Sequence, residues 1–282
     1  MSLDKLKTET SRKLRCAMTE WNAQEYDRLS ALQDTMAAEV LSLLQLNGNE
    51  RILDVGCGNG KTTASIAERV LRGSVMGVDA SADMIAFAKE HWTAGHPNLQ
   101  FAIADASHLP FKREFDLVVS FNALHWISDQ ALPLQGVHQA LISEGKAQLR
   151  LVAKGKRTCI EDVIEDTRKS PRWAGHFKDF RDPFLHVTPE QYAALAEQQG
   201  FRVLSIRTSD KAWDFGSRDA FLARMKVTMI EWTQHVPEAD RPAFITDVLD
   251  RYQPVAATAP KEENYFRFYQ MDIVLTPDTK AI

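Results

Sequence analysis

The chain has 282 residues, of which 44% are apolar and 26% are charged, and these values are typical of a globular protein, not of a disordered or collagen-like one. Basic and acidic side chains nearly balance at a formal net charge of -4, so the excess of positive charge that nucleic-acid binding uses is missing. The three cysteines show no CxxC pair and no cysteine-histidine spacing, which argues against a disulfide framework and against a structural metal site.

The sequence shows no segment for a membrane or for secretion. No stretch approaches the roughly 20 uninterrupted apolar residues of a membrane span, and the N-terminal segment lacks the apolar core of a signal peptide. We therefore expect a cytoplasmic protein with no membrane or nucleic-acid partner, and the sequence leaves open a monomer or a homodimer.

The first predicted elements alternate between helices and short strands. Apolar residues recur at helical spacing over residues 26–46, and Gly48 follows as a stop signal. Ser81 and Asp129 stand where helix N-caps belong. Buried strands that alternate with helices predict βαβ units and a parallel sheet. The five apolar runs that we interpret as these strands cover residues 51–55, 74–78, 99–104, 115–121 and 148–152.

The second half of the chain begins with helices. A polar helix is predicted over residues 159–169, followed by a loop with short helices over 171–186. Thr188 then begins a helix with the pattern of a capping box and a proline in the first turn, and Gly200 closes it.

Two more strands complete the predicted sheet, at residues 201–207 and 265–275, the second with apolar residues in period two. Two helical patterns lie between these strands, over residues 217–234 and 237–252. We therefore expect an α/β fold, a Rossmann-like seven-stranded sheet with helices on both faces. Its core would comprise residues 1–212 and 264–282, and residues 213–263 would form a helical lid inserted between the last two strands.

The sharpest signal is the turn after the first predicted strand, which reads Asp54-Val55-Gly56-Cys57-Gly58-Asn59-Gly60. Glycines let the backbone approach a bound ligand closely. A dinucleotide fingerprint would place its third glycine one position later, where the chain has Lys61. A carboxylate at Asp54 would repel a pyrophosphate but suits a ligand with positive charge. The alternatives are a doubly wound fold that binds another nucleotide, or an Asp54 that only caps the helix.

This turn resembles motif I of the class I S-adenosylmethionine-dependent methyltransferases. Three further strand ends agree with the resemblance, because Asp79 ends the second predicted strand, Asp105 follows the third and Asn122 follows the fourth. The resemblance implies that the chain is an enzyme, a transferase with S-adenosylmethionine as its cofactor and a small molecule as its methyl acceptor.

The resemblance also implies roles for single residues of the cofactor site. Asp54 would face the ammonium group, Asp79 would accept hydrogen bonds from both ribose hydroxyls, and Asp105 would accept one from the adenine amino group. Met84 and Ala106 would enclose the adenine ring. The full predicted set is Asp54, Gly56, Cys57, Gly58, Gly60, Asp79, Ala80, Met84, Asp105, Ala106, Phe121 and Asn122.

The acceptor site is suggested by the segment at residues 120–127, which contains Leu124-His125-Trp126. This segment is similar to one in the juvenile hormone acid and trans-aconitate methyltransferase families, which esterify small carboxylic acids. In the hormone-acid family the tryptophan, and a glutamine seven residues after an N-terminal tyrosine, hold the acceptor carboxylate. Gln33 and Tyr26 have that spacing here, and residues 21–26 are similar to the start of the trans-aconitate family. The resemblance thus implies an acceptor site of Tyr26, Gln33, His125 and Trp126.

Each acceptor-side residue also has a simpler interpretation. Trp126 could pack under the sheet edge, Gln33 could be a solvated helix residue, and His125 could be a general base or a hydrogen-bonded core residue. Arg267 interrupts the apolar face of the last strand, where it either pairs with a core acid or binds a substrate carboxylate from the lid side. The basic run at residues 154–157 could bind a second carboxylate or be solvated surface.

The chemistry of the acceptor decides which side chains the reaction needs. A carboxylate is already ionised at neutral pH and needs placement, whereas a phenol or an amine benefits from a general base. The sequence therefore predicts a methyltransferase that acts on a carboxylate oxygen of a small molecule. The alternatives are an N- or hydroxyl-O-methyltransferase and a module that binds S-adenosylmethionine without catalysis.

Overall fold

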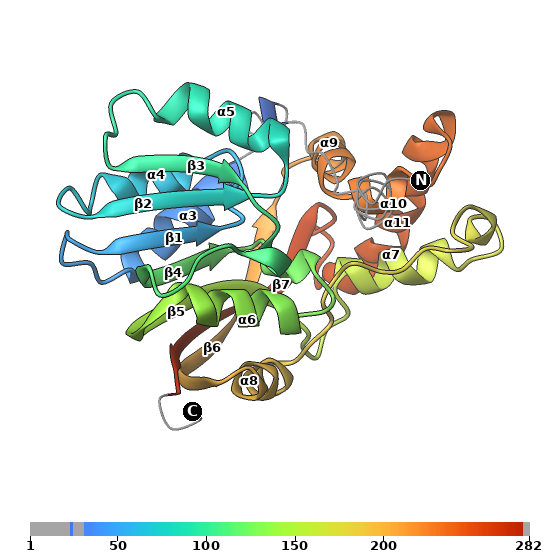
Figure 1. The fold of residues 1–282 in the computed structure, drawn as a ribbon. Coiled ribbons are helices and arrows are strands. Elements are labelled where there is room, and N and C mark those ends of the chain that lie inside the picture. Colours follow the sequence, from blue (N-terminus) through green and yellow to red (C-terminus); the bar gives the residue numbers. More distant parts are fainter. Residues whose placement is uncertain (1–22, 25–30, 279–282) are drawn as a thin grey trace, which may run out of the picture.

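A computed structural model describes residues 23–24 and 31–278, and these form a seven-stranded mixed sheet with the order β3-β2-β1-β4-β5-β7-β6 (Figure 1). Strands β1 to β5 are parallel neighbours in this order, and β7 is antiparallel to both β5 and β6. The strands are β1 (Arg51–Val55), β2 (Ser74–Asp79), β3 (Leu99–Ile103), β4 (Phe115–Phe121), β5 (Leu141–Ala153), β6 (Phe201–Asp214) and β7 (Tyr265–Pro277).

All seven predicted strands are present, but β5 and β6 are much longer than expected. The sequence predicted residues 148–152 and 201–207 for them, because apolar residues are concentrated in these parts. The outer half of β6 pairs with β7 as far as Asp214 with Tyr265, and most of its side chains are partly or fully exposed. Backbone pairing at an exposed sheet edge leaves no apolar pattern in the sequence, so the prediction stopped where the pattern stopped.

Helices cover both faces of the sheet, as predicted. Side chains of α4 (Lys61–Ala67) and α5 (Ala82–Trp92) share one buried cluster with Ile52, while α6 (Ala131–Ala140) and α8 (Pro189–Gln198) share another with Leu53. Successive side chains of a strand point to opposite faces, so neighbouring residues of β1 enter different cores. Helix α3 (Ala31–Leu43) contacts α4.

A third buried cluster lies beyond the carboxyl ends of β1 to β4, at the right of Figure 1. It joins α7 (Ile160–Arg168) to the helices between β6 and β7, which are α9 (Arg218–Thr228), α10 (Ile230–Thr233) and α11 (Arg241–Ala256). The single-turn 3-10 helices are η1 (Ala106–His108), η2 (Leu124–Trp126), η3 (Ala174–His176) and η4 (Glu238–Asp240). Over the described part of the chain, no helix is long and apolar enough to cross a membrane.

The predicted helix caps are mostly correct. The Ser81 hydroxyl accepts a hydrogen bond from the Met84 amide (3.3 Å), and Thr188 forms the expected capping box with Gln191. Asp129 is not the N-cap of α6, which is Gln130. The Asp129 carboxylate instead accepts from the Ala131 amide (3.0 Å), so it stabilises the same helix start from one position earlier.

Candidate active site

The glycine turn lies between the end of β1 and the start of α4, with Gly56, Gly58 and Gly60 at φ values of 76°, 54° and 79°. A Cβ atom on Gly56 would come within 2.2 Å of the Ala123 Cβ, and one on Gly60 within 2.7 Å of the Ala88 Cβ. Around Gly58, no atom of the described residues other than its two chain neighbours lies within 4 Å of such a Cβ. Packing therefore explains two of the glycines, and the third borders open space that a ligand can approach.

Two carboxylates hold this turn in place. Asp54 is 2% exposed and accepts a hydrogen bond from the Thr63 hydroxyl (2.7 Å), and burial raises the pKa of Asp54 to about 7. Asp79, at the end of β2, accepts from the amides of Gly58 and Ser81, both at 2.9 Å. Asp54 thus accepts a hydrogen bond from a side chain of α4. It is not the N-cap of this helix, which is Gly60.

The other predicted cofactor residues lie at the same edge of the sheet. Asp105 caps η1 after β3, and its carboxylate accepts from the Ser107 amide (2.8 Å). Met84 is buried in the first turn of α5, and Asn122 turns the chain after β4 with a φ of 57°. A positive φ is uncommon outside glycine, and asparagine tolerates it better than most residues. The edge therefore combines an open glycine, carboxylates and apolar side chains, which fits a nucleoside with a cationic amino acid part.

The turn with the Leu124-His125-Trp126 sequence is η2, and polar contacts fix it from two sides. The buried Gln130 amide donates to the Leu124 carbonyl (2.8 Å), and the Leu185 amide donates to the His125 carbonyl (2.8 Å). Phe184 packs against both His125 and Trp126, with ring centroids 5.2 and 5.4 Å apart. The two candidate side chains are therefore held in a defined orientation.

His125 is 4% exposed, and burial lowers its pKa to about 3. Its Nδ1 accepts a hydrogen bond from the Val152 amide (3.3 Å), so the neutral ring carries its proton on Nε2. A ring in this state has no lone pair ready to take a proton. The geometry agrees with a hydrogen-bonded core histidine and not with a general base.

A cavity of about 120 Å³ lies between η2, α3, α7, the α9–α10 region and β7. This volume is well above what a single water molecule needs. The wall is mainly apolar, and its aromatic members are Trp126, Phe215, Phe221, Trp232, Phe266 and Phe268. Asn122 and His125 also line it, so the cavity reaches the sheet edge where the predicted cofactor residues lie.

Two charged side chains of the described residues, Arg224 and Glu161, line this cavity and are 7% and 8% exposed. Neither residue was predicted from the sequence as part of a site. Arg224 lies on α9 three residues after the buried Phe221 and just before the buried Met225, so it is a charged residue on the apolar side of a helix. The same kind of signal drew attention to Arg267, and it would have found Arg224.

The other predicted acceptor-side residues are placed differently. Arg267 pairs with Glu262 (2.9 Å), so the pairing interpretation is correct, but its partner is partly exposed and is not the core acid that was expected. In the basic run, Arg157 pairs with Asp210. Tyr26 lies outside the described residues. Gln33 belongs to α3, but its side chain is not among those described.

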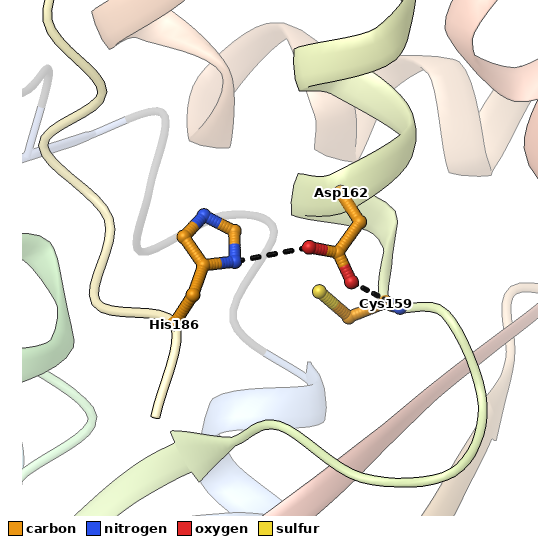
Figure 2. A group of neighbouring side chains, drawn as sticks. All are labelled: Cys159, Asp162 and His186. Atoms are coloured by element: carbon orange, nitrogen blue, oxygen red, sulfur yellow. Dashed lines mark hydrogen bonds and ion pairs between the residues drawn. The ribbon is translucent and has the colours of Figure 1, made fainter. Parts of the chain in front are cut away.

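A cluster of Cys159, Asp162 and His186 lies at the start of α7 (Figure 2). His186 places Nδ1 3.1 Å from Asp162 and Nε2 2.8 Å from Asp182. The hydrogen bonds to Asp162 and Asp182 raise the pKa of His186 to about 10, and the bond to His186 lowers the pKa of Asp162 to about 2. Since both ring nitrogens already donate to carboxylates, we interpret the cluster as an ion-pair clamp that holds the Phe184 loop to α7.

Comparisons with known proteins agree with the fold and the glycine turn. Residues 52–145 match the family described as "Methyltransferase domain". The trans-aconitate 2-methyltransferase of Shigella flexneri is 32% identical over 88% of this chain and 93% of its own length, and that of Deinococcus radiodurans is 25% identical over 91% and 98%. A solved phosphoethanolamine N-methyltransferase 2 of Haemonchus contortus, in complex with phosphomonomethylethanolamine and S-adenosylhomocysteine, superposes with a TM-score of 0.59 at 16% identity, over 93% of this chain and 59% of its own.

The chain belongs to the class I S-adenosylmethionine-dependent methyltransferases. It is an enzyme of this class, and its cofactor is S-adenosylmethionine. The class leaves the methyl acceptor unnamed beyond a small molecule.

Proposed function

We propose that this enzyme transfers the methyl group of S-adenosylmethionine to a carboxylate oxygen of a small organic acid. The observation that carries the proposal is the position of Arg224, a buried guanidinium on the wall of an otherwise mostly apolar cavity next to Trp126. A guanidinium matches the geometry of a carboxylate with two parallel N–H donors. The relatives named for trans-aconitate, itself a carboxylic acid, support the same acceptor chemistry.

The cofactor would lie along the carboxyl ends of β1 to β4 and supply a methyl group bonded to a positively charged sulfur. We assign Asp54 to its ammonium group, Asp79 to the ribose hydroxyls and Asp105 to the adenine amino group. Support comes from the open space at Gly58 and from Asp79, whose carboxylate is fixed by two backbone amides at this edge.

On the acceptor side, we assign the placement of the carboxylate to hydrogen-bond donors. These are the Arg224 guanidinium, the Trp126 indole N–H and the neutral His125 at Nε2, together with Gln33 and Tyr26, whose role here rests on the resemblance to the hormone-acid family. None of these groups needs to remove a proton, because the carboxylate is already ionised at neutral pH. Their contribution would be orientation of the nucleophile and exclusion of water.

The helical segment at residues 213–263 would act as the lid of this site, with the remaining residues as the cofactor-binding core. Support comes from α9 and α10, which contribute Arg224, Met229 and Trp232 to the cavity wall. Cys57 and Cys159 are free thiols, which agrees with a cytoplasmic location.

A second candidate is methylation of an amine. Glu161 and the aromatic wall favour it, because a carboxylate and ring faces together bind ammonium groups. The product separates the two candidates, since methyl esters hydrolyse in base and methylamines do not.

The test is turnover of S-adenosylmethionine with trans-aconitate and with aromatic and aliphatic monocarboxylic acids, followed by base treatment of the products. We expect base-labile products, and we expect Arg224→Met to raise the acceptor KM at least about tenfold, since a charge-assisted bond contributes about 1.5 to 3 kcal/mol. Lys226→Met is the matched control, because Lys226 is an exposed cation on the same helix. Base-stable products only, or an unchanged KM in Arg224→Met, would refute the carboxylate proposal.

A further inference from the structure

We infer that Glu161 is a second polar anchor in the acceptor cavity and selects acids that also carry a hydrogen-bond donor, a hydroxyl or an amino group. The inference rests on the proposed function, because it takes Arg224 as the site of the carboxylate. The chemical class of the acceptor is then an organic acid with an apolar body and a donor group.

The Glu161 side chain is buried on the wall of the cavity. Glu161 lies in the first turn of α7, lines the cavity and is 8% exposed, and its Oε2 has no hydrogen-bond partner among the described residues. Burial raises the pKa of Glu161, which reflects the cost of holding a charge there. Buried polar atoms in folded proteins nearly always have a partner, so an unpartnered oxygen on a cavity wall indicates a group that binds there.

Groups of the chain around Glu161 are the alternatives to a bound ligand as hydrogen-bond partners of its Oε2. The nearest cation on the loop is His186, but its two ring nitrogens donate to Asp162 and Asp182. The Cys159 thiol, at the start of the same helix, forms a side-chain hydrogen bond with Glu161, but Oε2 is left over, and Tyr252 on α11 donates its hydroxyl to the Arg267 carbonyl (3.0 Å). The described neighbours thus leave Oε2 to the cavity.

Arg224 and Glu161 would bind an acceptor at two separate points. Arg224 comes from α9 and Glu161 from α7, so the two charges enter one cavity from different helices. Apolar and aromatic side chains fill most of the wall around them. A carboxylate at Arg224 and a donor at Glu161 fix an acceptor at two points, whereas an acid with no donor leaves the Glu161 carboxyl without a partner. An unpaired buried group is what makes a site reject such an analogue.

The experiment compares matched acids that differ only in one substituent, hydrogen, hydroxyl or amino, placed at successive carbons of an aromatic or aliphatic monocarboxylic acid. For each set we measure kcat/KM in the wild type, Glu161→Gln, Glu161→Met and the control Asp166→Asn, an exposed carboxylate on the same helix. We expect the wild type to prefer a hydroxylated or an aminated acid over its unsubstituted partner by about tenfold or more.

The variants then distinguish the two kinds of donor. Glu161→Gln keeps an acceptor oxygen but loses the charge, so it should retain a preference for the hydroxyl and lose a preference for the ammonium group. Glu161→Met should lose both preferences and gain on the unsubstituted acid, and Asp166→Asn should behave as the wild type. A purely structural Glu161 would change the melting temperature but not the ratio between matched acids.

A wild type that shows no preference within any matched set, or a preference that Glu161→Met retains in full, would overturn the inference. Failure of the proposed function looks different, because in that case no acid is converted to a base-labile product at all. In that case we measure binding by calorimetry, with the same acids and their amine analogues in the presence of S-adenosylhomocysteine. No preference within any matched set, or a preference that Glu161→Met retains in full, again overturns the inference.

Discussion

At the scale of single residues, the neighbours His125 and Trp126 show how burial limits the chemistry a site can perform. The pKa of about 3 keeps His125 neutral at every physiological pH, and its Nδ1 is occupied by the Val152 amide. Trp126 is an indole and has no basic nitrogen at all. A site built from these side chains can orient an anion, but it is poorly suited to deprotonating an amine or a phenol.

Trp126→Phe tests the role of the indole N–H directly. Phenylalanine keeps an aromatic ring against Phe184 and Trp232 but has no donor, so packing survives and the hydrogen bond does not. We expect the acceptor KM to rise about tenfold with little change in the affinity for S-adenosylmethionine. Calorimetry and steady-state kinetics measure the two quantities. Full activity of Trp126→Phe on every accepted acid would show that Trp126 only packs.

Asp54 gives a prediction about pH. Its pKa is raised from 3.8 to about 7, so the carboxyl group is mostly protonated at pH 6 and mostly ionised at pH 8. An ammonium group binds the ionised form better, so the affinity for S-adenosylmethionine should increase severalfold as pH rises from 6 to 7.5. Isothermal titration calorimetry at several pH values measures this affinity. Asp54→Asn should bind more weakly with no such dependence, and an equal slope in both proteins would contradict the assignment.

Residue-scale prediction from the sequence succeeded where a spacing pattern fixes the position. The order of Gly56, Gly58 and Gly60 after a strand located the turn, and the cap at Ser81 followed from its place before a periodic run. Arg224 and Glu161 belong to no such pattern. Their importance comes from a cavity between helices that are far apart in the sequence, and helical periodicity does not show which helix packs against which.

At the scale of elements, ion pairs around the buried Arg150 side chain connect α3 to the sheet. Arg150 on β5 bonds Asp272 on β7 through Nε (2.6 Å) and Nη2 (3.0 Å), and it also contacts Glu39 on α3 (3.3 Å). Lys211 on β6 bonds the other oxygen of Glu39 (2.7 Å). Since α3 contributes Met36 to the cavity wall, these pairs position one side of the cavity.

We expect Arg150→Met to lower the free energy of unfolding by about 3 kcal/mol, because it breaks a buried charge network and leaves Asp272 without its partner. Arg51→Met is a matched control, since Arg51 makes a similar two-bond pair with Asp116 but has a side chain that is 49% exposed. That variant should cost less than about 1 kcal/mol. Urea denaturation measures both, and equal losses would show that burial does not decide the contribution.

At the scale of the whole molecule, the protein has two cores on the faces of the sheet and a third within the helices beyond the strand ends. The third core joins α7 and the loop from Trp173 to Phe184 with the helices after β6. The sequence predicted α7 and two helical patterns after β6, the first of which is divided at Met229 into α9 and α10, and it assigned only residues 213–263 to the lid. Helices that precede β6 in the chain and helices that follow it share this core. Tertiary packing decides which helices are partners, and local periodicity in the sequence does not reveal it.

This arrangement predicts how the helices respond to ligands. The cavity lies where the third core meets the sheet edge, so an acceptor bound there would contact α9 and α10 from inside and reduce their local opening. We expect slower hydrogen exchange in α9, α10 and α11 when S-adenosylhomocysteine and an accepted acid are added together. The cofactor product alone should slow exchange mainly at the glycine turn and the first turn of α5, and α8, which covers β6 in a different core, serves as the internal control. If calorimetry shows that both ligands are bound and exchange in α9 to α11 does not change, these helices are a fixed wall of the cavity and not a lid.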